Sequence, residues 1–203
     1  MSQPYRYTNA KPSHTHAYLM PTVERHLERV GARTVFDLGC GNGSKAHHLS
    51  RHYEVTGVDA SSDGIREANR AYPELKLEIG SAYDDLADRY GTFDAVVSLE
   101  VVEHLYEPRR WASTLFSLVK PGGIAVVSTP YHGYLKNLVL AATGKMDNHF
   151  TALWDGGHIK FWSIATLSAL LQEAGFRDLD VSRVGRIPPL AKSMIVATQK
   201  PLR

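Results

Sequence analysis

Two short segments of this sequence combine residue types that could bind a ligand and move a proton. The first, residues 35–43, reads Val-Phe-Asp-Leu-Gly-Cys-Gly-Asn-Gly, so an apolar run ends in Asp37 and glycines follow at alternate positions. Glycine has no Cβ and tolerates positive φ, which lets the backbone of such a loop approach a ligand closely. An apolar strand, a glycine turn and the start of a helix together indicate a site for a nucleotide-like cofactor.

The second segment is Glu100-Val101-Val102-Glu103-His104, directly after an apolar run. Residues at i, i+3 and i+4 share one face if the segment is helical. Two carboxylates and an imidazole there could hold a divalent metal such as Mg²⁺ or form an acid–base relay, although such residues also serve as ordinary caps. His158, in a Gly-Gly-His segment, is a candidate base or fourth ligand. We therefore predict His104, His158 and Glu103 as catalytic, and Glu100, Glu103, His104 and His158 as the metal ligands if a metal is used.

The elements that must position these residues follow a regular rhythm. Apolar runs predict strands at 34–38, 53–59, 75–79, 93–99 and 124–128, and helical patterns separate them at 44–51, 62–71 and from Pro108 onwards. Because these connections are long enough for right-handed crossovers, the sheet should be parallel and covered on both faces. A helical pattern covers residues 16–30, and its helix could start near Met20 so that Pro21 lies in the first turn. A turn at 121–123, a helix over 163–174 and a terminal hairpin (179–184 with 194–198) complete the prediction.

The carboxyl ends of parallel strands meet at one edge of a sheet, where ligands bind. Asp37 lies beside the glycine loop, where it could receive an ammonium group. Asp59 ends its strand twenty residues beyond Gly39, a spacing suited to an acid that binds ribose hydroxyls. The alternative is that Asp59 is only a solvated acid at a strand end. Ser81-Ala82-Tyr83 could meet an adenine ring, and Leu99-Glu100 the reacting end of the cofactor. The predicted cofactor-binding residues are Asp37, Gly39, Cys40, Gly41, Gly43, Asp59, Ala60, Ser81, Ala82, Tyr83, Leu99 and Glu100.

The glycine spacing distinguishes between cofactors. Dinucleotide folds use Gly-x-Gly-x-x-Gly, whereas this loop is Gly-x-Gly-x-Gly preceded by Asp-Leu. Over roughly residues 34–128 the chain resembles the class I S-adenosylmethionine-dependent methyltransferases, whose first motif is Asp/Glu-x-Gly-x-Gly-x-Gly. The resemblance implies a Rossmann-like α/β fold: a seven-stranded, mostly parallel sheet with helices on both faces and the last strand antiparallel. It also implies S-adenosyl-L-methionine as cofactor, with the three glycines on its methionine part and Asp59 on its ribose.

Residues 98–104 narrow the resemblance further. They look like the corresponding stretch of the ubiquinone-biosynthesis O-methyltransferases, which also have a Gly-x-His near the position of His158. The Glu-x-x-Glu-His pattern is similar, too, to that of the small-RNA 3′-end 2′-O-methyltransferases, where it binds metal. Ser81 departs from the Asp often found at that position in the superfamily, so the adenine contact is carried over less firmly.

Residues 131–162 interrupt the alternation after the fifth strand and are rich in aromatic side chains. A long insertion there could close over the methyl-accepting side as a lid, and its apolar lining suggests an aromatic or hydrophobic acceptor. The same aromatics could instead form a satellite core or a homodimer contact. An N-terminal arm and helix, residues 1–31, could close the other side through Tyr5, Tyr7, His14 and His16. We predict a single methyltransferase domain over 1–203.

Composition limits the alternatives. The chain has 203 residues, 43% hydrophobic and 22% charged, with a net charge of +2 and one cysteine. The weak positive charge disfavours RNA as substrate, and no Tyr-x-x-x-Lys set supports a nicotinamide-dependent oxidoreductase. A single cysteine, no signal peptide and no membrane span predict a cytoplasmic protein. The predicted function is methyl transfer from S-adenosylmethionine to a small-molecule acceptor, most simply at a hydroxyl oxygen; a non-catalytic binding domain would leave the Glu-x-x-Glu-His cluster unexplained.

Overall fold

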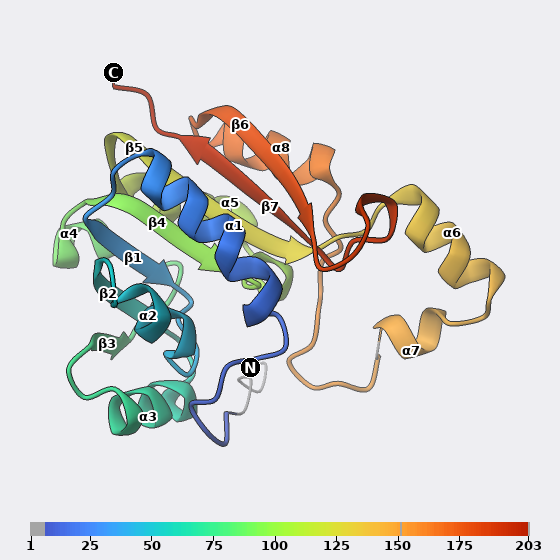
Figure 1. The fold of residues 1–203 in the computed structure, drawn as a ribbon, viewed down its shortest axis with the longest axis horizontal. Coiled ribbons are helices and arrows are strands. Elements are labelled where there is room, and N and C mark those ends of the chain that lie inside the picture. Colours follow the sequence, from blue (N-terminus) through green and yellow to red (C-terminus); the bar gives the residue numbers. More distant parts are fainter. Residues whose placement is uncertain (1–6, 151, 203) are drawn as a thin grey trace.

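A computed structural model describes residues 7–150 and 152–202 of the chain. Within these residues seven strands form one sheet in the order β3-β2-β1-β4-β5-β7-β6 (Figure 1). All neighbouring pairs are parallel except those of β7, which runs antiparallel to both β5 and β6. This is the predicted sheet with its antiparallel last strand. The strands are β1 Thr34–Leu38, β2 Glu54–Asp59, β3 Lys76–Ile79, β4 Phe93–Leu99, β5 Val119–Pro130, β6 Arg177–Val184 and β7 Ser193–Gln199.

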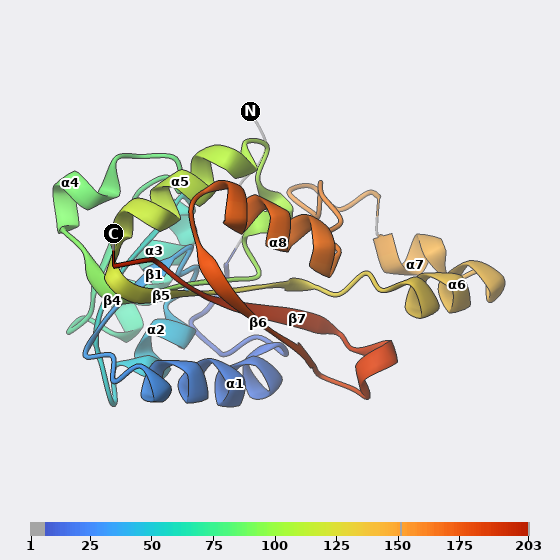
Figure 2. The ribbon, with the colours of Figure 1, turned by 90° about the horizontal axis from the view of Figure 1, so that it is seen from above.

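Helices cover both faces of the sheet, as Figure 2 shows with the sheet nearly edge-on. One apolar cluster joins α1 (His16–Arg29), α2 (Ser44–Leu49) and α3 (Ser62–Ala71) to one face, and a second joins α4 (Leu86–Tyr90), α5 (Pro108–Leu118) and α8 (Ile164–Glu173) to the other. Side chains alternate between the two: Val35 packs in the first cluster and Phe36 in the second. Burial on both faces explains why the strands read as continuous apolar runs.

Several boundaries differ from those predicted. Helix α1 begins at His16 and continues through Pro21, rather than starting near Met20. Proline removes only one backbone N–H, and the buried residues of α1 hold the helix against the sheet despite this loss. Gly43 takes the N-cap position of α2 with a left-handed φ of 75°, and Ser44 is the first residue of the helix, which ends at Leu49 and not at residue 51. Helix α4 was not predicted.

The predicted turn at 121–123 lies inside strand β5. The pairing of β4 with β5 shifts register between Phe93 and Ala95, so the extra residues of β5 form a bulge. Gly122 has a φ of +80°, and a Cβ on Gly123 would lie 2.6 Å from the Asp94 carbonyl oxygen. The glycines therefore let the strand bulge without breaking.

The insertion contains two further helices, α6 (Tyr134–Ala142) and α7 (Met146–Phe150), which lie together beyond the carboxyl end of β5 (Figure 1). The sequence indicated no regular structure there. Neither helix has a buried residue, so neither packs into the core of the domain. No helix among the described residues is both long and apolar enough to cross a membrane.

Candidate functional site

The glycine loop joins β1 to α2 in a conformation that requires glycine. Gly39, Gly41 and Gly43 have φ values of +95°, +56° and +75°. A Cβ on Gly39 would lie 2.5 Å from a methyl group of Val101, which follows β4. The loop backbone is therefore packed against the end of the neighbouring strand, and its other side faces a cavity.

Asp59 connects the glycine loop to the end of β2. Its carboxylate accepts hydrogen bonds from the backbone N–H of Gly41 and of Ser61, both at 2.8 Å. Burial raises the pKa of Asp59, while these two hydrogen bonds and the charge of Lys45 oppose the rise. The carboxylate thus orders both loops, and the ribose contact predicted for it stays a prediction.

Asp37 is a buried carboxyl group with no hydrogen-bond partner among residues 7–150 and 152–202. Only 1% of its surface is exposed, and neither oxygen accepts a hydrogen bond from the residues that the structure describes. Burial raises its pKa to about 7, Lys45 opposes the rise and Asp59 adds to it. Such an orphaned carboxyl beneath a ligand loop fits a role in attracting a cationic group of the cofactor.

A cavity of about 1270 Å³ opens where the strands end, large enough for a nucleoside cofactor and an acceptor together. Asp37 and Gly43 do not line it: Asp37 lies one layer beneath the loop, and Gly43 packs against Leu77 and Ala68. The predicted residues that do line it are Gly39, Cys40, Gly41, Asp59, Ala60, Ser81, Ala82, Tyr83, Leu99, Glu100, Glu103, His104 and His158.

The segment after β3 forms a self-supporting turn on the cavity wall. The Ser81 N–H donates to the Asp84 carboxylate at 2.8 Å, and the Tyr83 N–H donates to the Ser81 hydroxyl at 3.2 Å. The guanidinium of Arg110 lies 5.1 Å from the centre of the Tyr83 ring. Serine therefore shapes this turn, and its adenine contact is not tested by the structure.

Glu100 is held apart from the rest of the Glu-x-x-Glu-His segment. It has a left-handed φ of 61° and precedes a single 3₁₀ turn, η1 (Val102–His104), so the segment is not the continuous helix on which a shared face depends. The Ser128 hydroxyl donates to one carboxylate oxygen at 2.8 Å, and the Ser193 hydroxyl to the other at 3.3 Å. Burial raises the pKa of Glu100.

Glu103, His104 and His158 do come together, with one potential ligand atom from each within 4.8 Å of the others. The Glu103 carboxyl is buried and has no hydrogen bond of ordinary geometry with any described residue, the nearby Thr129 hydroxyl included. Burial and the charge of Glu100 raise its pKa well above the usual value. A buried, orphaned carboxyl beside two imidazoles fits either a divalent cation or a proton.

Both imidazoles of this cluster are neutral near pH 7. Burial lowers the pKa of His104, and burial together with His104 lowers the pKa of His158 to about 4. Nδ1 of His104 lies 3.0 Å from the carbonyl oxygen of Gly156, and because a carbonyl only accepts, Nδ1 carries the proton. Nε2 then presents the lone pair. The ring centroids of His104 and His158 are 4.9 Å apart.

Lys45 is the residue that sequence reasoning missed. It lies in the first turn of α2, and its Nζ donates to the Leu99 carbonyl oxygen at 2.9 Å. Its charge opposes the rise in pKa of four acids at the site, Asp37, Asp59, Glu100 and Glu103. A lysine two residues after the last glycine of the loop was the available signal.

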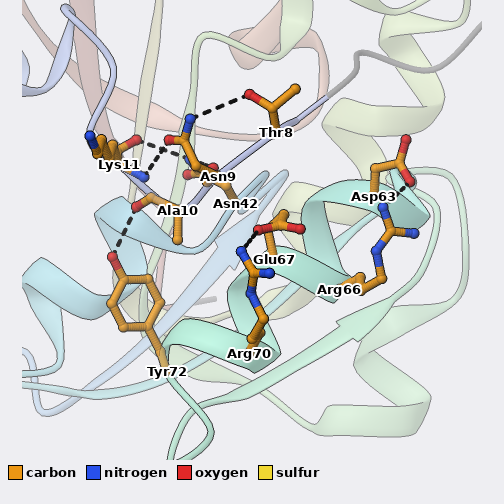
Figure 3. A network of polar contacts seen from close by, with 10 residues as sticks. All are labelled: Thr8, Asn9, Ala10, Lys11, Asn42, Asp63, Arg66, Glu67, Arg70 and Tyr72. Carbon is orange, nitrogen blue, oxygen red and sulfur yellow. Dashed lines mark hydrogen bonds and ion pairs between the residues drawn. The ribbon is translucent and has the colours of Figure 1, made fainter.

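The N-terminal segment lies across the glycine loop (Figure 3). The Asn42 amide donates to the carbonyl oxygens of Asn9 and Lys11 at 2.9 and 3.0 Å, and the Tyr72 hydroxyl donates to that of Ala10 at 2.9 Å. A Cβ on Gly41 would lie 2.5 Å from the Tyr7 hydroxyl oxygen. The segment therefore covers the part of the cavity that the glycine loop lines.

The other predicted N-terminal residues have separate positions. His14 lines the cavity with Tyr7, and Tyr5 falls outside the described residues. His16 begins α1 instead and packs edge-on against His48, with ring centroids 4.9 Å apart.

The insertion divides its aromatic side chains among three environments. Phe150 and Trp154 line the cavity, as a lid would require. Trp162 is buried and donates from its indole N–H to the Val102 carbonyl oxygen at 3.3 Å, whereas Tyr134 is 83% exposed. The backbone N–H of Ile159 donates to the Glu103 carbonyl oxygen at 2.9 Å, so the returning end of the insertion is fastened to the cluster. Trp162 belongs to the main apolar cluster between the sheet, α5 and α8, and the lid, the satellite core and the dimer contact stay predictions.

The sheet order, the left-handed glycine loop and the acid that ends β2 define a class I S-adenosylmethionine-dependent methyltransferase. Residues 11–181 match the model of the methyltransferase domain family, and the chain belongs to that family.

Relatives and a solved structure agree with this membership. A ubiquinone biosynthesis O-methyltransferase of Xanthomonas axonopodis pv. citri is 32% identical over 168 residues, 79% of this chain and 69% of the relative. One from Caulobacter vibrioides is 39% identical over 116 residues, 55% of this chain and 46% of that protein, so the chain spans about half of its length. A methyltransferase structure from Archaeoglobus fulgidus shares the fold at 21% identity, with a TM-score of 0.66 over 89% of this chain and 94% of that one.

Proposed function

We propose that this protein transfers the methyl group of S-adenosylmethionine to a hydroxyl oxygen of a small acceptor. The observation that carries the proposal is the cluster of Glu103, His104 and His158 on the wall of the cavity that the glycine loop also lines. Neutral imidazoles beside a buried carboxyl can take the proton that a hydroxyl must lose, and relatives named as O-methyltransferases support oxygen as the nucleophile.

Methyl transfer is an in-line displacement at an already electrophilic sulfonium methyl. The protein therefore has to hold the nucleophilic oxygen about 3 Å from the methyl carbon and remove its proton. The glycine loop, Asp59 and Lys45 hold the cofactor side in place. Nε2 of His104 accepts the proton of the acceptor hydroxyl, while Glu103 and His158 orient the hydroxyl and offset the charge that develops.

The same three side chains suit a divalent cation. Glu103, His104 and His158 would hold a divalent cation, and two imidazoles beside a carboxylate favour a transition-metal ion over Mg²⁺. Such an ion would lower the pKa of a coordinated hydroxyl. Glu100 is directed to Ser128 and Ser193 and lies outside this set, so our proposed ligands are three of the four predicted from the sequence.

The acceptor side suggests a flat, partly apolar substrate. Phe150, Trp154, Leu105 and Ile159 line the cavity near the cluster. Aromatic side chains bind planar rings through their faces and edges. We therefore propose an aromatic acceptor with a free hydroxyl group.

The test measures formation of S-adenosylhomocysteine with dihydroxyaromatic probes, with and without added Mg²⁺, added Mn²⁺ or a chelator. His104→Ala and Glu103→Gln should each lower turnover by about 10²–10⁴-fold while the affinity for S-adenosylhomocysteine stays within about threefold. His52→Ala, which changes an exposed histidine outside the cavity, is the control and should leave turnover unchanged. Unchanged turnover in both cluster variants would refute the proposal.

A further inference from the structure

Three basic side chains line one wall of the cavity, and we call them the basic wall: Lys136, Arg186 and Lys192. Lys136 belongs to α6 of the insertion, whereas Arg186 and Lys192 flank the 3₁₀ turn η2 (Pro188–Leu190) between β6 and β7. Helix α6 contacts η2, and Figure 1 shows the β6–β7 connection next to α6. Segments about fifty residues apart in the sequence therefore meet here.

Hydrogen bonds to backbone carbonyl oxygens hold this wall together. The Lys136 Nζ donates to the Tyr131 carbonyl oxygen at 2.8 Å, and the Tyr131 N–H donates to the Lys192 carbonyl oxygen at 2.9 Å. The next residue, Ser193, donates its hydroxyl to Glu100. The basic wall therefore lies beside Glu100, and it comes from the insertion and the β6–β7 connection, not from the loops that hold the cofactor.

Glu100 lies beside the three positive charges of the basic wall but forms no ion pair with them. Nine ion pairs join described residues elsewhere, but none of them includes Lys136, Arg186 or Lys192. Lys136 is half-buried, whereas Arg186 and Lys192 are exposed. Burial and the charge of Arg186 lower the pKa of Lys136, and the charge of Glu100 opposes this fall. Like charges gathered at a partly enclosed surface repel one another, and an anion bound between them would remove that cost.

We propose that the basic wall is a subsite for an anionic group of the methyl acceptor, a carboxylate or a phosphate. The inference rests on the proposed function for the position of the acceptor. The acceptor then has two functional ends. Its anionic group binds the basic wall, and its hydroxyl lies at the cluster of Glu103, His104 and His158. Arginine and lysine bind such groups through charge-assisted hydrogen bonds.

The competing explanation is that the basic wall only offsets the buried charge of Glu100. Two probes of nearly equal shape separate the two explanations: 3,4-dihydroxybenzoate carries a carboxylate and 3,4-dihydroxybenzamide does not. A third probe, (3,4-dihydroxybenzyl)phosphonate, distinguishes a phosphate-type from a carboxylate-type anion. Methyl transfer to each probe is measured with the full chain, together with probe binding to its S-adenosylhomocysteine complex.

We expect the anionic probes to have a lower KM than the amide. Arg186→Gln and Lys192→Gln should each raise KM for the anionic probes by about tenfold, with little change in kcat and none in KM for the amide. Lys145→Gln removes a positive charge from the same insertion outside the cavity and should change nothing.

Two results would overturn the inference: equal KM values for benzoate and benzamide in the unaltered protein, or variants that affect both probes alike. If no probe is methylated although S-adenosylhomocysteine binds, binding of the probes decides. Tighter binding of the anionic probes than of the amide, weakened by Arg186→Gln, would support the subsite although the proposed reaction fails. Equal binding of the anionic probes and the amide would refute the subsite.

Discussion

Binding of S-adenosylhomocysteine should release a proton from Asp37 at pH 6 and almost none at pH 8. Asp37 is buried, has no hydrogen-bond partner among the described residues, and has a pKa of about 7. At pH 6 about nine-tenths of the Asp37 carboxyls are therefore protonated, and at pH 8 about one-tenth. An ammonium group on the cavity side of the loop favours the carboxylate and expels the proton.

Titration calorimetry in buffers of different ionisation enthalpy counts these protons. The dependence of the binding heat on buffer should correspond to about 0.9 proton released at pH 6 and about 0.1 at pH 8. Asp37→Asn keeps the shape of the side chain but has no proton to lose, so its binding heat should not depend on the buffer through this group. Equal heats in both buffers at pH 6, or the same proton count in Asp37→Asn, would refute the role assigned to Asp37.

The same group should make the protein alone less stable as the pH rises. An acid whose pKa is raised by folding binds its proton more tightly in the folded than in the unfolded state. Its stabilising contribution is present at low pH and is lost between about pH 4 and pH 7. A rise of about three pKa units corresponds to a loss of about 4 kcal/mol in the free energy of unfolding as the pH rises. Asp37→Asn has no proton to lose, so urea unfolding at pH 8 should not show this loss in the variant.

Three further changes test other parts of the site and the core. Gly39→Ala places a Cβ at a φ of +95° and 2.5 Å from a methyl group of Val101, so calorimetry should show at least a tenfold loss of cofactor affinity. Its control is Gly31→Ala, where φ is +63° and the added Cβ meets no atom within 4 Å. The control should lose about 1 kcal/mol of stability and keep its affinity for the cofactor. Asn42→Ala removes two hydrogen bonds to the N-terminal segment and should raise the dissociation constant of S-adenosylhomocysteine about fivefold and speed proteolysis of that segment. Trp111→Ala empties a fully buried site and should lower the free energy of unfolding in urea by about 3–5 kcal/mol.

Local patterns predicted the glycine loop and the acid at the end of β2, which line one cavity in the structure, whereas long-range contacts set the rest of the cavity wall. The positions of Gly39 and Asp59 follow from strand and turn signals within a few residues of each. The orientation of Glu100 depends on a left-handed backbone and on serines 28 and 93 residues away, which no local pattern records. The helices of the insertion were missed because they bury nothing, so their apolar residues show no clear helical stripe.

The antiparallel strand explains why the acceptor half was harder to predict than the cofactor half. The cofactor half is built at the carboxyl ends of β1 and β2, where the parallel rhythm places it. Strand β7 runs the other way, so its beginning reaches that same edge of the sheet and places Ser193 on Glu100 with Lys192 beside it. A search for functional residues at strand ends alone overlooks these two positions. The direction of one strand thus places the basic wall next to Glu100 at the edge of the cavity. Substitutions at Lys192 and Ser193 should therefore weaken binding of the acceptor more than binding of the cofactor.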